Sequence, residues 1–206
     1  MNYIITIGRQ LGSGGKMIGG LLSERLGIPC YDKELIELAA TESGLGKEFF
    51  EKIDEKSSHS FLGNLFGFRS GFMGDNSGNY LSNEMLFKIQ SDVIRNLAEK
   101  SGIFVGRCAD YILRDHPHCL KIFITANTED RINRISHDQG ISKEKAAALI
   151  EEIDRKRAAY YNYFNNKTWG MAASYDLCIN SSVFSEEDII GIIIKQVGVK
   201  ATASKL

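Results

Sequence analysis

Short apolar segments alternate with amphipathic segments along most of the chain. Runs rich in β-branched and apolar residues predict buried strands over Tyr3–Ile7, Ile28–Tyr31, Ile103–Val105, Leu120–Thr125 and Tyr175–Ile179. Apolar residues at helical spacing predict helices over about 15–26, from 33 to about 44, from 82 or 83 to 100, over 109–113, from 127 or 128 to 140, from 142 to about 164, and over 189–197. This alternation predicts an α/β fold with a five-stranded parallel sheet and helices on both faces.

Several helix ends have sequence signals of their own. Asp32 and Ser142 are placed to cap the helices that follow them, and Ser185-Glu186-Glu187-Asp188 resembles a capping box for the last helix. The polar tail from Lys200 is expected to fray.

The stretch at about residues 44–83 breaks the alternation. Glycines alternate there with serines and phenylalanines, above all over residues 57–82, and their spacing defeats both helix and strand. The phenylalanines argue against a plain disordered linker, because such linkers are poor in aromatic residues. We therefore expect a mobile insertion that closes over a ligand or packs against a partner chain, which would offer a surface for a homo-oligomer.

Composition narrows the class of protein. A chain of 206 residues suits one α/β domain with a small inserted lobe, and a net charge of −1 gives no general attraction to nucleic acid or to anionic membranes. No apolar run approaches the roughly 20 residues of a membrane span, and the opening residues lack the features of a signal peptide.

The cysteines form no C-x-x-C pair and lie in apolar runs, which predicts buried thiols and a reducing cytoplasm; these are Cys30, Cys108, Cys119 and Cys178. The histidines show no pairing typical of a zinc site.

The stretch GRQLGSGGKMIG, residues 8–19, lies between the first strand and the first helix. Strand, glycine-rich turn and helix together form an arrangement that wraps backbone N–H groups around a phosphate. A dinucleotide fingerprint would need a third glycine where Met17 stands. A mononucleotide P-loop fits better in either of two registers. One matches Gly15 and Lys16 to the motif's GK, and the other makes residues 12–14 the crest, with Gly15 at the lysine position and Lys16 at the hydroxyl position.

Further segments make the chain similar to a known family. The loop with LGIPCYDKELI, then FVGRCADYIL, LKIFITANTEDRINRI, KRAAYYNYF and YDLCINSS, resembles the cytidylate kinase-like family of P-loop proteins, from residue 4 to about 182. The resemblance implies the three-layer fold of the P-loop nucleoside monophosphate kinases, as a single domain over 1–206. It also implies an acceptor-binding insertion at about 44–83 and a helical lid at about 131–170. ATP would be the phosphoryl donor, and CMP or dCMP the most plausible acceptor.

Candidate site residues follow from the loop and from this resemblance. Donor phosphates would lie on Gly12, Ser13, Gly14, Gly15, Lys16 and Met17. The acceptor side would use Asp32, Arg107 and Asp110, and the lid would supply Arg131, Arg134, Arg155 and Arg157. Catalytic charge stabilisation would fall to Lys16, Arg107, Arg155 and Arg157, because arginine forks bind phosphate oxygens well.

Each of these charged residues also has a structural interpretation. Asp32 could simply cap a helix, Arg107 could form a structural ion pair, and the other arginines could be solvated on the surface. Tyr160, Tyr161 and Trp169 could stack on a base or belong to the core.

One feature departs from ordinary P-loops. No Ser or Thr follows the lysine, so the usual protein ligand of Mg²⁺ is missing and the metal ligands stay unknown, with Asp32 or water as replacements. Three functions remain open: phosphoryl transfer from ATP to a nucleoside monophosphate, the same chemistry on another small acceptor, and a nucleotide-binding sensor or scaffold without turnover.

Overall fold

The computed structural model describes residues 2–32 and 78–203. The chain divides into two compact units, one formed by Met1–Asp32 with Ala98–Leu206 and the other by Lys33–Leu97. The helix expected from Lys33, its cap by Asp32 and most of the expected insertion at about 44–83 lie outside the described residues, and so does the proposed oligomer surface.

The first unit contains a five-stranded sheet, as the sequence predicts. Its strands are β1 (Ile4–Arg9), β2 (Cys30–Tyr31), β3 (Gly102–Val105), β4 (Cys119–Thr125) and β5 (Leu177–Asn180). They lie in the order β2-β3-β1-β4-β5, and every pairing is parallel. β1 is central, with Ile4 paired to Gly102 on one side and to Cys119 on the other. The carboxyl ends of parallel strands share one edge of the sheet, so the segments that follow β1, β2 and β3 meet there.

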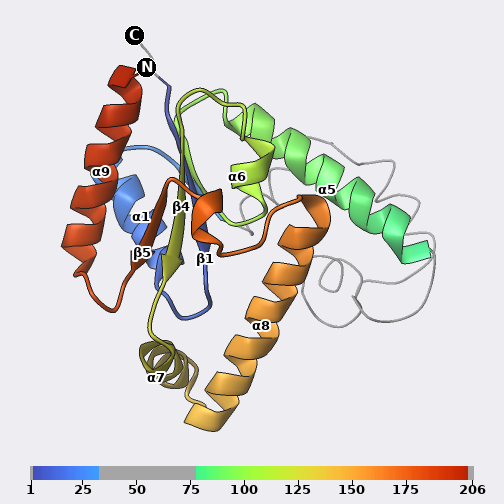
Figure 1. Cartoon of the computed structure of the whole chain (residues 1–206), viewed down its shortest axis with the longest axis vertical. Helices are drawn as coiled ribbons and strands as arrows, with labels where there is room; N and C mark the ends of the chain where they lie inside the picture. Colours follow the sequence, from blue (N-terminus) through green and yellow to red (C-terminus); the bar gives the residue numbers. More distant parts are fainter. Residues whose placement is uncertain (1, 33–77, 204–206) are drawn as a thin grey trace. The chain divides into compact units, whose positions relative to one another are not determined.

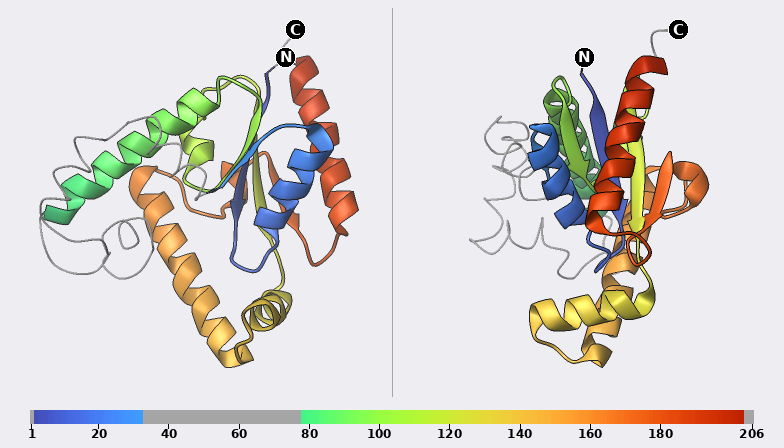
Figure 2. Two further views of the ribbon diagram at one scale, coloured as in Figure 1. Left: turned by 180° about the vertical axis from the view of Figure 1, so that it is seen from behind. Right: turned by 90° about the vertical axis from the view of Figure 1, so that its left-hand side faces the viewer.

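Helices cover both faces of the sheet, which confirms the predicted layers. In the first unit these are α1 (Gly15–Leu26), α6 (Ala109–Ile112), α7 (Thr128–Gln139), α8 (Lys143–Phe164) and α9 (Glu186–Ala203), with a short 3₁₀ helix at Ala172–Ser174. α1 and α9 lie on one face and α6 on the other, while α7 lies beyond the carboxyl end of β4 (Figures 1 and 2). The largest buried cluster joins the strands to α1 through Ile18 and Leu22 and to α9 through Ile189 and Ile193.

The cap signals explain two boundaries. Ser142 Oγ accepts the Lys145 N–H at 3.3 Å, and α8 begins at the next residue. Ser185 and Asp188 form the predicted capping box, since Ser185 Oγ accepts the Asp188 N–H at 3.2 Å and the carboxylate of Asp188 accepts the Ser185 N–H at 3.3 Å. α9 therefore starts just after Ser185, earlier than the predicted apolar run. It continues to Ala203, so the polar residues from Lys200 extend the helix, and their fraying stays a prediction.

α5 (Gly78–Leu97) is the last element of the second unit. It begins about one turn before the predicted start at Ser82, and its periodic apolar residues Leu86, Ile89, Val93 and Ile94 are buried. No helix within 2–32 and 78–203 is long and apolar enough to cross a membrane.

The four cysteines are free thiols that differ in burial, and Cys30 is only partly buried. Cys108 and Cys119 are buried as predicted, whereas Cys178 is exposed. The expectation was wrong for Cys178 because its strand, β5, lies at the edge of the sheet. Burial, and then the charge of Asp32, raise the pKa of the Cys30 thiol to about 11, so this thiol stays protonated at neutral pH.

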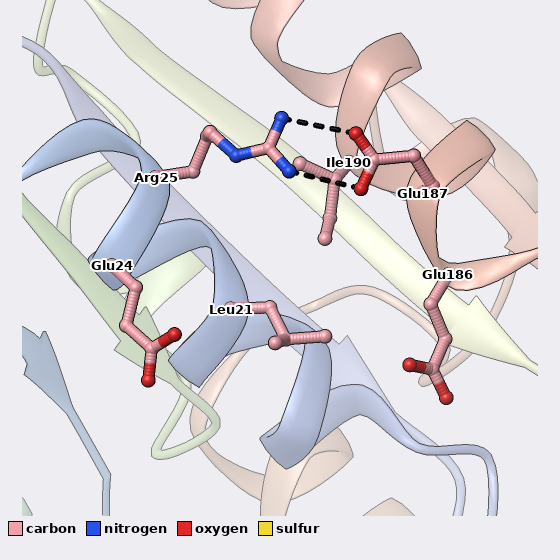
Figure 3. A pocket seen from close by; sticks show the side chains of 6 residues that line it. All are labelled: Leu21, Glu24, Arg25, Glu186, Glu187 and Ile190. Atoms are coloured by element: carbon pink, nitrogen blue, oxygen red, sulfur yellow. Dashed lines mark hydrogen bonds and ion pairs between the residues drawn. The ribbon is translucent and has the colours of Figure 1, made fainter.

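A surface groove runs between α1 and α9. Arg25 donates two hydrogen bonds across it to the carboxylate of Glu187, at 3.0 and 2.9 Å, and both partners are exposed (Figure 3). The rest of its lining is Leu21, Glu24, Glu186 and Ile190. An exposed pair of this kind contributes little to stability because water screens it, so the buried cluster beneath it does most to hold α1 against α9.

Candidate functional site

The loop between β1 and α1 has the geometry of an anion cradle. Gly12 and Gly14 adopt left-handed backbone angles, with φ of 76° and 79°, and α1 begins directly after Gly14. The opening N–H groups of a helix have no acceptor within it, and the helix dipole favours negative charge at this end. Because the turn falls on residues 12–14, the geometry favours the P-loop register in which these residues form the crest.

Ser13 stabilises the loop from inside. Its side chain is buried, and its hydroxyl donates to the Gln10 carbonyl at 2.8 Å. The hydroxyl of Ser181, which follows β5, donates to the Ser13 carbonyl at 2.8 Å. The hydroxyl of Ser13 is thus used within the loop, and its N–H also donates to the Gln10 carbonyl at a long 3.4 Å.

Arg9, the last residue of β1, was missed by sequence reasoning. A Cβ at Gly15 would lie 2.6 Å from the Arg9 Cβ, and a Cβ at Gly106 would lie 1.9 Å from Arg9 Nη1. The two glycines therefore make room for the Arg9 side chain, whose guanidinium reaches the carboxyl end of β3. Its position at the end of the predicted first strand could have marked Arg9 as a candidate, because ligands of open α/β sheets bind at the carboxyl ends of the strands.

Lys16 and Asp32 form an ion pair. Lys16 Nζ lies 2.7 Å from Asp32 Oδ2, and the side chains are 70% and 17% exposed. The pair joins the second residue of α1 to the residue that follows β2, so the expected donor cation and acceptor acid lie together. Because an ion pair with so exposed a partner is weak, it can exchange partners at little cost.

The turn after β3 carries Arg107 in a strained conformation. Gly106, Arg107 and Cys108 have successive φ values of 82°, 56° and 55°. A left-handed conformation costs a residue with a side chain about 1 kcal/mol or more. A hydrogen bond between Arg107 and the Tyr160 hydroxyl helps to hold the turn. Because the turn directly follows β3, Arg107 lies at the carboxyl edge of the sheet, where the sequence predicts an acceptor cation.

Asp110 is buried, and its carboxylate accepts a hydrogen bond from the Tyr161 hydroxyl at 2.7 Å. Burial raises the pKa of Asp110 despite this bond. The pair ties the first turn of α6 to α8. Its burial leaves Asp110 better suited to fixing the site than to touching a ligand.

The aromatic residues considered for base stacking pack within the protein. Tyr161 is buried against Asp110, and the ring of Tyr160 meets that of Phe164 edge-on at 4.9 Å between centroids. The Trp169 ring meets Phe123 edge-on at 5.3 Å. These contacts favour the core interpretation.

Replacing Tyr161 with phenylalanine should destabilise the protein by about 1–3 kcal/mol, because a buried carboxylate loses its donor. The matched control is Tyr163→Phe, at an exposed tyrosine on the same helix, which should change the free energy of unfolding little. Urea unfolding of both variants would measure the difference. Equal stabilities of the two variants would contradict the assigned contact.

The raised pKa of Asp110 also predicts a pH dependence. Its ordinary value is 3.8, so the folded state holds a proton that the unfolded state has lost at pH values between the two. The contribution of Asp110 to stability is fully present below 3.8 and is lost as the pH rises through the folded-state pKa. Unfolding free energies of wild type and Asp110→Asn across this window should differ in slope, because the loss of stability that Asp110 causes as the pH rises is absent from the variant; parallel curves would contradict the assignment.

Arginines from α7 and α8 converge on the backbone of the β1–α1 loop. Arg131 Nε donates to the Leu11 carbonyl at 2.7 Å, Arg134 donates to the Gly12 carbonyl, and Arg157 donates to the Arg9 carbonyl at 3.1 Å. Burial and the charge of Arg131 lower the pKa of Arg157, while Asp154 acts in the opposite direction. Arg131 and Arg134 thus share the helix face that their spacing predicts. Arg155 is exposed on α8 and does not join them.

Asp154 is the second residue that sequence reasoning missed. Its carboxylate pairs with Arg131, lies 3.8 Å from Arg157 and accepts the Leu11 N–H at 2.8 Å. The only available signal was an acid beside the basic run of α8, which an exposed helix face would show equally.

Comparison with known proteins places the chain in a family. The cytidylate kinase-like family matches residues 4–183. A cytidylate kinase of Archaeoglobus fulgidus is 25% identical over 200 residues, covering 95% of each chain. Among solved structures, an uncharacterized protein from Eubacterium ventriosum is 25% identical with a TM-score of 0.72, covering 96% of this chain and 99% of that one.

A more distant neighbour confirms the fold alone. A shikimate kinase from Bacteroides thetaiotaomicron is 14% identical with a TM-score of 0.52, covering 95% of this chain and 98% of that one. The fold is therefore that of the P-loop kinases, as the sequence predicted. The matches support a transferase of the nucleotide kinase class, and the chain belongs to the cytidylate kinase-like family.

Proposed function

We propose that the protein transfers the γ-phosphoryl group of ATP to a nucleoside monophosphate, with CMP or dCMP as the preferred acceptor. The observation that carries the proposal is the convergence of Arg131, Arg134 and Arg157 on a glycine-rich loop that opens a helix. Membership of the cytidylate kinase-like family supports a nucleotide acceptor. The cytoplasm, which provides ATP and keeps thiols reduced, is the proposed setting.

The donor half of the site would rest on the loop. Phosphoryl transfer needs little covalent chemistry from the protein, because positioning and charge neutralisation provide most of the acceleration. Backbone N–H groups of residues 12–17 would bind the donor phosphates. Position 15 carries no side chain, so the charge that a P-loop lysine supplies would come from Lys16, Arg134 and Arg157, with Arg155 available if the lid closes.

The acceptor half would lie at the carboxyl ends of β2 and β3. Arg107 would bind the acceptor phosphate, and Asp32 would bind polar groups of the acceptor. Asp110, which the sequence assigns to the same half, would act mainly by fixing α6 through its bond with Tyr161.

A kinase of this family implies ATP and usually Mg²⁺, which would neutralise phosphate charge when bound. No group of three His, Cys, Asp or Glu side chains within residues 2–32 and 78–203 could hold a metal ion. Mg²⁺ bound with a nucleotide often uses only one or two protein carboxylates and completes its shell with water and phosphate oxygens. Asp32 fits that requirement, because it follows a strand end and its ion pair with Lys16 is partly solvated.

Steady-state assays with ATP, Mg²⁺ and CMP or dCMP test the proposal through release of ADP. We expect ADP to be released faster with CMP or dCMP present than by ATP hydrolysis alone, with the matching cytidine diphosphate formed. Absence of diphosphate would reject this acceptor class. Calorimetry then separates the alternatives: ATP binding without turnover on any acceptor would favour a nucleotide sensor, which the missing loop hydroxyl makes worth testing.

Replacing Lys16 with alanine should raise the KM for ATP by roughly tenfold, since a charge near the donor phosphates is lost. Lys195→Ala, at an exposed lysine on α9, is the matched control and should leave ATP kinetics unchanged. Initial rates over a range of ATP concentrations provide the measurement. Unaltered kinetics in Lys16→Ala would mean that another residue supplies the cation.

A further inference from the structure

Leu11 is held by α7 and α8 through its backbone and its side chain. Its N–H donates to Asp154 Oδ1 at 2.8 Å, and its carbonyl accepts from Arg131 Nε at 2.7 Å. Its side chain packs against a small cluster formed by Ile135, Ala146 and Ile150. A loop residue one position before the crest is therefore fixed by both of its backbone polar groups and by its side chain.

The two charged partners are themselves enclosed. Arg131 and Asp154 pair with side chains only 7% and 14% exposed. A buried pair is costly to break, because removing one partner leaves the other charged and unpaired. The Arg131 side chain joins both groups at once, since Nε binds the Leu11 carbonyl and a terminal nitrogen binds Asp154.

The backbone of α7 also touches the crest. A Cβ at Gly12 would lie 2.9 Å from the Arg131 carbonyl oxygen and 3.1 Å from its Cα. The position of α7 thus limits where the backbone of Gly12 can lie. Leu11 immediately precedes the residues proposed to bind donor phosphates, and Gly12 is the first of them, so the placement of these two residues sets the direction of the N–H groups.

We propose that Arg131 and Asp154 form a positioning clamp that fixes the β1–α1 loop in its phosphate-binding conformation. The inference rests on the proposed function, and it assigns to Arg131 a structural contact with the loop in place of a direct contact with substrate. Neither clamp residue touches the donor. The clamp makes donor affinity depend on how α7 and α8 sit against the loop, so the lid helices and the loop bind nucleotide as one unit.

The test compares Asp154→Ala with Asp154→Asn and with Glu152→Ala. Glu152 lies on the same helix and pairs with Lys156 away from the loop, which makes it the matched control. Two readouts are used: the dissociation constant of ATP by calorimetry, and hydrogen exchange of the Leu11 amide by NMR. Asp154→Ala should weaken ATP binding roughly tenfold or more and accelerate Leu11 exchange, as expected for loss of a charge-assisted hydrogen bond.

Asparagine keeps an oxygen that can accept the Leu11 N–H, so Asp154→Asn should restore much of the protection of Leu11 while remaining weaker for ATP. Glu152→Ala should change neither readout. Arg131→Lys, which keeps the charge but cannot make both arginine contacts, serves if Asp154→Ala fails to fold and should show the same pair of effects.

Unchanged Leu11 exchange in the folded variants would overturn the clamp. Faster exchange with unchanged ATP affinity would show a purely structural pair, and it would also overturn the proposal. If wild-type protein bound no ATP, the proposed function would fail, and the clamp would then be judged on Leu11 exchange alone.

Discussion

Arg157→Ala should lower kcat for phosphoryl transfer by about two orders of magnitude while changing the KM values for ATP and acceptor much less. Arg157 lies at the start of the β1–α1 loop, where its guanidinium donates to the Arg9 carbonyl at 3.1 Å. Negative charge shifts onto the transferred group and the leaving oxygen only as the reaction proceeds. In the proposed site Arg157 lies beside the transferred group, and it would therefore stabilise the transition state more than the bound substrates, at a magnitude typical of such groups.

Lys143→Ala gives the control, since Lys143 is an exposed cation on the first turn of the same helix. It should behave like wild type, which separates the position of the charge from the net charge of α8. A rise in KM with kcat intact would assign Arg157 to ground-state binding instead.

Gly12→Ala should weaken ATP binding by at least about tenfold and destabilise the fold by roughly 1–2 kcal/mol. Gly12 has a φ of 76°, which an alanine adopts only with strain. The added Cβ would also lie 2.9 Å from the Arg131 carbonyl oxygen, a backbone atom that moves only if α7 moves. Relief of this contact would displace the crest and redirect its N–H groups.

Gly27→Ala separates the two causes. Gly27 has a φ of 64° at the far end of α1, and a Cβ there would meet nothing within 4 Å. It should therefore show a comparable loss of stability from backbone strain, measured by thermal unfolding, with normal ATP affinity. Equal ATP affinities in the two variants would show that the crest does not bind the donor.

The local structure of the loop could be predicted from the sequence because its causes are local. Apolar β-branched residues mark β1, and glycines mark the turn. Ser142 and Ser185 mark helix starts through bonds that span only three residues. Arg131 and Arg134 could be placed on one helix face by their spacing, and both do bind the loop.

The partners of these residues could not be predicted, since they depend on how distant elements pack. Lys16 meets Asp32 only because α1 and β2 lie side by side in the fold. Asp154 reaches Leu11 across 143 positions of sequence, and nothing in the basic run of α8 distinguishes it from a surface acid. Asp110 shows the same limit, since its burial under Tyr161 follows from the packing of α8 on α6.

The most direct test of the central claim is transfer of labelled phosphate from γ-labelled ATP to a panel of nucleoside monophosphates, with the products separated by chromatography. We expect label in CDP or dCDP in preference to the diphosphates formed from AMP, GMP and UMP. The label in the cytidine diphosphates should be lost with Arg157→Ala and retained with Lys143→Ala. Label that appears only in inorganic phosphate, or equally with wild type and Arg157→Ala, would contradict a nucleotide kinase site built from this loop and these arginines.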